Sequence, residues 1–150
     1  MEAKASFVLN FAFNGGVRRS FVSIPTSPKN ACRFTVKAAV REINSSNELD
    51  MALLDAGDRL AVLQFSAGWC GPCRVIAPIF ESFSEKYKDV VFLYMQTDKN
   101  DDLKKLTQTL AIRMLPTFRF YHNGKRVDHL SSAKAALLEQ AIIDNSPKKD

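Results

Sequence analysis

The chain has 150 residues, 46% apolar and 25% charged, which is typical of a globular domain and excludes a wholly disordered chain. No apolar run approaches the roughly 20 residues that a membrane-spanning helix needs. The net charge of +5 comes from residues 1–38, which hold six basic residues and one acidic residue. Of the 21 basic and 16 acidic residues, 15 of each remain in residues 39–150, and this balance argues against a nucleic-acid-binding surface.

The first segment, residues 1–38, is rich in Ser and Thr, contains scattered basic residues and has no sustained hydrophobic periodicity. This composition is typical of an organelle transit peptide. Residues 36–39, VKAA, resemble a stromal processing site of plastid precursors, so we expect cleavage near Ala38 and a location in the chloroplast stroma. Mitochondrial import is the alternative, because Arg18 and Arg19 would suit an amphipathic presequence.

Cleavage near Ala38 would leave a single domain, residues 39–150, with no internal repeat or linker. It would also remove Cys32, so that the domain would retain two cysteines, Cys70 and Cys73. We expect this domain to be a monomer.

Strand and helix patterns alternate along the domain. Short apolar runs predict buried strands, and apolar residues at helical spacing predict amphipathic helices. The order βαβαβαββα predicts an α/β fold with a central mixed β-sheet flanked by helices on both faces. The predicted strands are 40–43, 60–65, 90–95, 117–121 and 125–130, and the helices are 45–56, a helix following residue 70, 100–110 and 132–144.

Local signals support these boundaries. Ser45 and Glu48 have the spacing of a capping box, and Gly57 is a helix stop. Pro78 lies inside the helix after residue 70 and should kink it. Asn123-Gly124 is the strongest short hairpin signal and joins the last two strands.

The stretch 66–73 reads SAGWCGPC and places Cys70 and Cys73 two residues apart. A zinc site would need four ligands, and His122 and His129 are six residues apart on either side of the predicted turn, so we expect no metal. A purely structural disulfide is a weak alternative, because closing so small a loop removes little chain entropy. A redox-active pair remains.

The position of this stretch at the start of a helix favours redox chemistry. At the start of a helix Cys70 meets unpaired backbone N–H groups and the positive end of the helix dipole, which favour its thiolate form. Pro72 fits the first helical turn. We expect the Cys70 sulfur to be exposed, Cys73 to be protected one turn into the helix, and Trp69 to lie exposed beside the site.

At this point the chain resembles the thioredoxin family over residues 40–144, because WCGPC is the active-site motif of that family. Leu115-Pro116-Thr117 matches its cis-proline element, and residues 123–125 match its late hairpin. The resemblance implies a thioredoxin fold in which Pro116 is cis and faces the cysteines. It also implies that Trp69, Gly71, Pro72, Leu115 and Pro116 form the surface that binds substrates, with Leu115 pairing with an extended segment.

The sequence departs from the family pattern at several positions. The buried acid six residues before the first cysteine is replaced by Gln64, and its usual lysine partner aligns with Tyr94. A glycine near the last helix appears as Ser132, and the segment 98–112 is about three residues longer than usual. Gln64 is therefore the position at which we expect proton transfer from the second cysteine to be altered.

The resemblance implies a protein disulfide reductase in which Cys70 attacks and Cys73 resolves, with no cofactor. Its partners would be disulfide-containing target proteins and an unidentified electron donor, either a reductase or the glutathione system. One alternative is an oxidising or isomerising member of the family. Another is a thioredoxin-fold scaffold or binding subunit, although a scaffold does not need both thiols.

Overall fold

A computed structural model describes residues 40–148, so the predicted transit peptide and its cleavage site lie outside the described residues. Nine elements follow one another in the predicted order. They are β1 (Arg41–Ile43), α1 (Ser46–Ala56), β2 (Ala61–Ser66), α2 (Gly71–Lys86), β3 (Val91–Gln96), α3 (Asp101–Thr109), β4 (Thr117–His122), β5 (Lys125–Leu130) and α4 (Ala135–Asn145).

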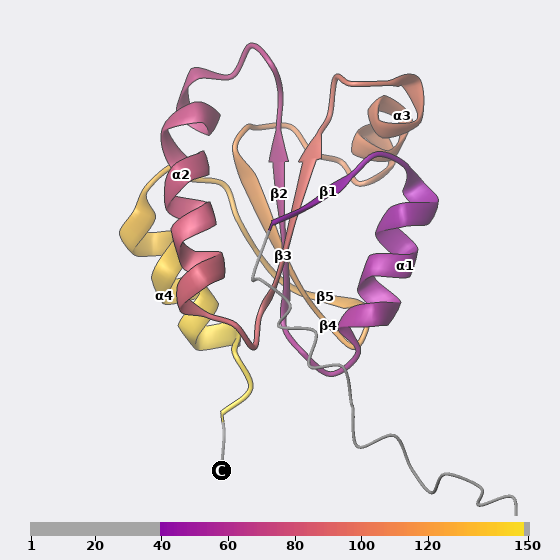
Figure 1. Ribbon diagram of the computed structural model, residues 1–150. Helices are drawn as coiled ribbons and strands as arrows, with labels where there is room; N and C mark the ends of the chain where they lie inside the picture. Colours follow the sequence, from indigo (N-terminus) through magenta and orange to yellow (C-terminus); the bar gives the residue numbers. More distant parts are fainter. Residues whose placement is uncertain (1–39, 149–150) are drawn as a thin grey trace, which may run out of the picture. The chain divides into compact units, whose positions relative to one another are not determined.

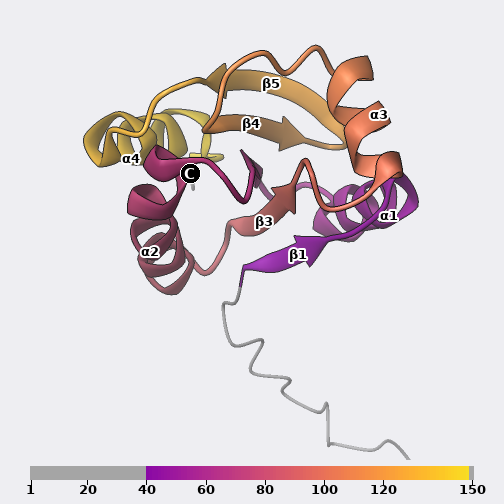
Figure 2. The same cartoon turned by 90° about the horizontal axis from the view of Figure 1, so that it is seen from above.

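The strands form one mixed sheet in the order β1-β3-β2-β4-β5. Strands β1, β3 and β2 are parallel, whereas β4 pairs antiparallel with both β2 and β5. Helices α1 and α3 cover one face and α2 and α4 the other, as Figures 1 and 2 show from two directions. The predicted fold class is therefore confirmed. The parallel strands β2 and β3 end on the same side of the sheet (Figure 1), where Gly68 after β2 contacts Asp98 after β3.

Two hydrophobic cores fill the space between the sheet and its helices, because alternate strand residues point to opposite faces. Under α1 and α3, the core includes Leu63 and Phe65 of β2. Under α2 and α4, it includes Val62 of β2 and Phe80 of α2. The central strand β2 is buried along its whole length, which explains why its sequence shows no alternation of apolar and polar residues.

The local signals are largely confirmed. Ser45 caps α1 by accepting a hydrogen bond from the N–H of Glu48. The carboxylate of Glu48 accepts from the N–H of Asn44, one residue earlier than the reciprocal bond of a capping box. Gly57 ends α1 with φ 58°, and Asn123 and Gly124 form the turn between β4 and β5 with positive φ values of 51° and 72°.

The start of the last helix was predicted three residues too early. Helix α4 begins at Ala135, because the N-cap Lys134 has extended backbone angles and the Ser132 hydroxyl accepts a hydrogen bond from the Lys134 N–H. Such a local bond competes with helical pairing.

Helix α2 continues through Pro78 without interruption from Gly71 to Lys86. No helix in residues 40–148 is long and apolar enough to cross a membrane.

Candidate active site

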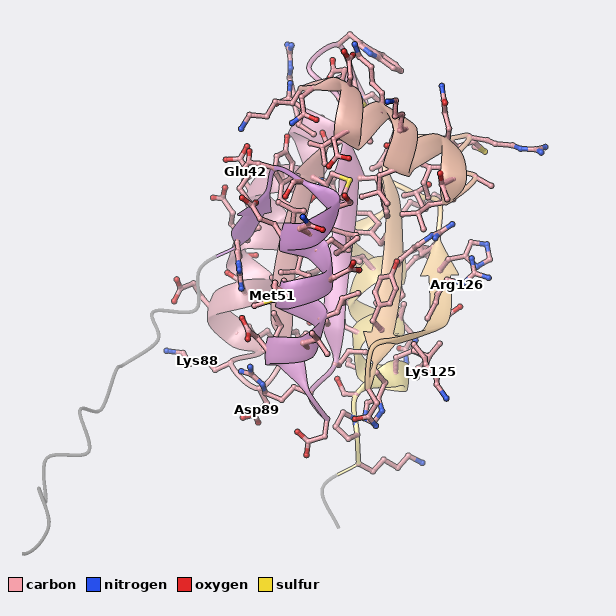
Figure 3. The ribbon with its side chains drawn as sticks, turned by 90° about the vertical axis from the view of Figure 1, so that its right-hand side faces the viewer. Glu42, Met51, Lys88, Asp89, Lys125 and Arg126 are labelled. Carbon is pink, nitrogen blue, oxygen red and sulfur yellow. A yellow bond between two sulfur atoms is a disulfide. The ribbon has the colours of Figure 1, made fainter. Side chains whose placement is uncertain are left out.

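The two cysteines of the CGPC motif form a disulfide bond, with their Cα atoms 5.3 Å apart. Cys70 is the N-cap of α2, and its sulfur accepts a hydrogen bond from the backbone N–H of Cys73 at 3.3 Å. Gly71 and Pro72 form the exposed first turn, where the missing N–H of proline costs no helical bond. The pair lies at the end of the sheet where β2 and β3 terminate, and the yellow bond in Figure 3 marks it.

Both sulfur-bearing residues are buried in this disulfide form, Cys70 being 3% and Cys73 2% exposed. The expectation that the Cys70 sulfur would be exposed is therefore wrong for the oxidised protein. The cause is packing, because both cysteines form a small apolar cluster with Ala67, and Leu115 packs against it. A target must approach through the surface that surrounds this cluster.

That surrounding surface is apolar and exposed. Trp69 is 75% exposed, and Val75 and Met114 are also largely exposed, which makes these side chains available for contact with another protein. The predicted exposure of Trp69 is confirmed. The bond between Leu115 and Pro116 is cis, as predicted, and Leu115 meets the cysteine cluster.

Two polar contacts fix the loop before the cysteines, and sequence reasoning did not identify either. The Asp98 carboxylate accepts the backbone N–H of Gly68, with distances of 3.1 and 3.2 Å to its two oxygens. Arg74 donates from Nη2 to the carbonyl of Gly68 at 2.6 Å. The signal available in the sequence was the position of Asp98 just after β3, at the same sheet edge as Cys70. Together these contacts hold the backbone that carries Trp69.

Gln64 is fully buried in β2, and neither its amide nitrogen nor its amide oxygen has a hydrogen-bond partner. Tyr94, which aligns with the usual lysine partner of the acid, lies directly beside it on β3. A pocket of about 310 Å³ adjoins Gln64 and is also lined by Ala77, one helical turn beyond Cys73. Gln64 is thus a polar group placed at the apolar core, near the helix face that carries the second cysteine.

The two histidines lie on the β4–β5 hairpin. His122 is near the turn, where its Nδ1 forms a hydrogen bond with the side chain of Asn123, and His129 is on the edge strand β5. Within residues 40–148 no group of three or more His, Cys, Asp or Glu side chains is placed to hold a metal ion.

A mixed sheet with a disulfide-bonded cysteine pair at the N-terminus of a helix, against which Leu115 of the cis Leu115-Pro116 bond packs, defines a thiol–disulfide oxidoreductase. The family model for thioredoxin matches residues 40–144. The chain belongs to the thioredoxin family.

Individual relatives agree with this assignment. Thioredoxin of Equus caballus is 42% identical over 103 residues, which cover 69% of this chain and 95% of that protein. The crystal structure of thioredoxin f from spinach chloroplast (short form) has a TM-score of 0.66 at 34% identity, covering 73% of this chain and 96% of the other. A crystal structure of a ferredoxin:thioredoxin reductase and thioredoxin f2 complex contains a chain with a TM-score of 0.66 and 37% identity, covering 71% and 94%.

Proposed function

We propose that this protein reduces disulfide bonds in other proteins, with Cys70 as the attacking thiol and Cys73 as the resolving thiol. The observation that carries the proposal is the position of Cys70 at the N-cap of α2, where its sulfur already accepts the Cys73 N–H. This N–H and the helix dipole favour negative charge on the Cys70 sulfur, and the thiolate is the nucleophile in disulfide exchange.

The reaction consists of two exchanges. The Cys70 thiolate attacks one sulfur of the target disulfide, the other target sulfur leaves as a thiolate and takes a proton, and a mixed disulfide joins Cys70 to the target. The Cys73 thiolate then attacks the Cys70 sulfur and releases the second target thiol. Two electrons have passed to the target, and the protein is left with the Cys70–Cys73 disulfide seen in the structure.

The exposed apolar surface beside the cysteines would hold the target during these steps. Trp69 offers a flat apolar face, and the exposed Gly71-Pro72 turn leaves the approach to Cys70 open. Across the site, the backbone of Leu115 next to cis-Pro116 would pair with an extended segment of the target, as an added strand does.

The electron donor would be a reductase or the glutathione system. The reductase is supported by the structural similarity to a chain crystallised with a ferredoxin:thioredoxin reductase. Reduction of the disulfide must come from such a donor, because the cycle leaves the protein oxidised.

The trapping experiment tests the reductase proposal. In the Cys73→Ser variant the mixed disulfide at Cys70 cannot be resolved, so incubation with an organelle extract should capture targets that dithiothreitol releases. The Cys70→Ser variant is the matched control and should capture far fewer. Equal capture by both variants, or none by either, would contradict the assignment of Cys70 as the attacking thiol.

We also propose that the protein acts in the chloroplast stroma, with the mitochondrion as the alternative. The basic, Ser- and Thr-rich composition of residues 1–38 supports import, and the similarity to a thioredoxin f from spinach chloroplast favours the plastid. Fusion of residues 1–45 to a fluorescent reporter tests this. Fluorescence in plastids would support the proposal, fluorescence in mitochondria would favour the alternative, and a cytosolic or secreted reporter would contradict both.

A further inference from the structure

A second polar site lies beside the cis-proline loop. A pocket of about 170 Å³ opens between the end of α3 and the edge strand β5. The residues that line it include Arg113, Arg119, His129, Thr117 and Ser131, and none of its lining residues is acidic. The pocket therefore concentrates positive charge and hydrogen-bond donors within a few residues of Pro116.

Arg119 is the unusual member of this group. It lies in the middle of β4, between Leu63 of β2 and His129 of β5, and is only 7% exposed. Its guanidinium lies 5.8 Å from the ring centroid of Phe65, and Nη2 donates to the carbonyl of Leu110 at the end of α3. Within residues 40–148 no carboxylate forms an ion pair with it.

A buried cation without an anionic partner is costly, and most buried charges in proteins are paired. A guanidinium has five N–H donors, and the bond to Leu110 uses one of them. No nitrogen atom of Arg119 is both inaccessible to solvent and without a hydrogen-bond partner. Because Arg119 lines the pocket, the pocket is the route by which a ligand would reach its other donors. The bond that caps α3 uses one N–H donor of Arg119, and it gives no partner to the other four.

The two hydroxyl groups are hydrogen-bonded within the protein and do not supply the donors for a ligand. Thr117 Oγ1 lies 2.7 Å from the carbonyl oxygen of Met114 and 2.9 Å from Ser131 Oγ. With the Thr117 proton donated to Met114, Ser131 donates to Thr117, so both hydroxyl protons are used. The donors free to meet a ligand are those of the two arginines and the His129 ring. Arginine donors match the geometry of a carboxylate or phosphate group.

We propose that this pocket binds an oxyanion, and that the oxyanion is a side-chain carboxylate of the target protein. The inference rests on the proposed reductase function. Leu115 contacts the cysteine cluster, while its neighbours Met114 and Thr117 line the pocket, so the two sites share one loop. An extended segment advances about 3.3 Å per residue. Three positions span about 10 Å of extended chain, so the carboxylate that we assign to the pocket belongs to an acidic residue within three positions of the attacked cysteine.

The test uses disulfide-linked homodimers of single-cysteine peptides, in which both sulfur atoms are equivalent. Glu or Gln is placed at each of the three positions on either side of the cysteine, and the second-order rate constant for reduction by the reduced protein is measured at constant ionic strength. At one or more positions the Glu peptide should react about tenfold faster than its Gln counterpart, as expected for a charge-assisted bidentate contact. Equal rate constants at every position would overturn the proposal.

Three variants assign the preference to the pocket. Arg119→Gln keeps a side-chain N–H donor for the Leu110 carbonyl. Arg113→Gln changes an exposed residue, so it tests the pocket even where Arg119→Gln fails to fold. Each should bring the Glu-to-Gln ratio of rate constants close to one. Lys125→Gln is the matched control, because it removes one exposed positive charge from β5 at the end of the sheet away from the disulfide (Figure 3). Lys125→Gln should leave the Glu-to-Gln ratio unchanged. The proposal would be overturned if Lys125→Gln lowered this ratio as much as Arg119→Gln does.

Two further measurements separate the possible failures. Reduction of uncharged 2-hydroxyethyl disulfide reports the redox site alone, so loss of reduction of this compound and of all peptides would refute the reductase function itself. Reduction of Gln and Glu peptides without preference would refute only the pocket. Titration with inorganic phosphate, followed by NMR shifts of the Thr117 and Ser131 amides, tests a free anion as ligand. Phosphate binding without any peptide preference would overturn the assignment to a target carboxylate.

Discussion

At the scale of single residues, Cys70 and Cys73 differ in their backbone surroundings more than in their exposure. Both are nearly fully buried as a disulfide. Cys70 is the N-cap of α2 and its sulfur receives an N–H, whereas Cys73 lies within the helix and supplies that N–H. The difference in reactivity between the two thiols should therefore come from electrostatic stabilisation at the helix N-terminus.

Brief alkylation of the reduced protein near neutral pH should modify Cys70 about tenfold faster than Cys73, because the thiolate is the reactive form. Mass spectrometry of the peptides that contain each cysteine measures the two rates. Alkylation of the denatured protein is the control and should label both equally. Preferential labelling of Cys73 in the folded protein would reverse the assignment of the two thiols.

Gln64 is the residue at which the buried acid of other thioredoxins is absent. A carboxylate there would act as a general base for the proton of Cys73, which an amide cannot do. We expect Gln64→Glu to raise the rate of insulin reduction near pH 7 severalfold. We also expect it to lower the free energy of unfolding by about 1–3 kcal/mol, because a more polar group enters the core.

Rate profiles from pH 6 to 9 for wild type and Gln64→Glu, with thermal midpoints for both, decide this prediction. Gln64→Met is the matched control. It removes both unpaired amide atoms and should neither raise the rate nor lower the midpoint. Superimposable pH profiles for wild type and Gln64→Glu would mean that water already relays the proton and that Gln64 has only a packing role.

At the scale of elements, the loops after β2 and β3 are joined at the active site. The Asp98 carboxylate accepts the Gly68 N–H, and this contact orients the backbone that presents Trp69. We expect Asp98→Ala to lower the rate constant for reduction of a protein disulfide by about threefold to tenfold, as loss of a typical hydrogen bond would. Reduction of 2-hydroxyethyl disulfide should hardly change, because that small molecule does not need the surrounding surface.

Asp101→Ala is the control for the loss of charge, since Asp101 is an exposed acid three residues further along the chain. It should leave both rates near their wild-type values. An equal loss for the protein substrate and the small disulfide in Asp98→Ala would show that Asp98 acts on the cysteines themselves instead of on the docking surface.

On the opposite side of the sheet, α2 and α4 are joined by a polar contact. Hydrogen bonds from Lys86, and secondly from Tyr87, hold the pKa of Glu139 below its ordinary value of 4.5. A carboxyl group with a lowered pKa in the folded state stabilises the protein above its unfolded pKa, and this contribution is lost as the pH falls through the folded pKa.

Glu139→Gln should therefore lower the thermal midpoint slightly at pH 7, and the difference from wild type should disappear as the pH falls below 4.5. The effect should be small because Lys86 is exposed and Glu139 only half-buried, so solvent screens the pair. Glu85→Gln, which changes an exposed acid of α2 next to Lys86 in the chain, should show no such pH dependence. Thermal melts between pH 3 and pH 7 measure both, and a difference that grows as the pH falls would contradict the sign.

At the scale of the whole molecule, the order of the elements followed from the sequence because each strand and helix has its own local signal. The CGPC turn, the hairpin at Asn123-Gly124 and the cap at Ser45 each depend on neighbouring residues only. The start of α4 was misplaced because its first turn lacks a side-chain cap and Ser132 bonds locally instead. Helical periodicity alone does not detect that competition.

The parts of the site that sequence reasoning missed all depend on tertiary contact. Asp98 meets Gly68 across 30 residues of chain, and the burial of the cysteines depends on packing of the distant Leu115. Arg119 occupies an inward position of a central strand, where an apolar residue would ordinarily be expected. Neither hydrophobic periodicity nor a local sequence motif predicts any of these contacts.

The central claim is that this thioredoxin-family protein reduces its targets, and the midpoint potential of the Cys70–Cys73 couple tests it most directly. A strong oxidant has a reduced form stabilised beyond that of thioredoxin. Here the Cys70 sulfur receives one backbone N–H, and the side chain of the neighbouring Arg74 is bonded to Gly68 instead. Equilibration with glutathione or dithiothreitol buffers should give a potential near −270 mV, as in thioredoxin, whereas a value between about −180 and −120 mV would contradict the reductase assignment and favour an oxidising or isomerising protein.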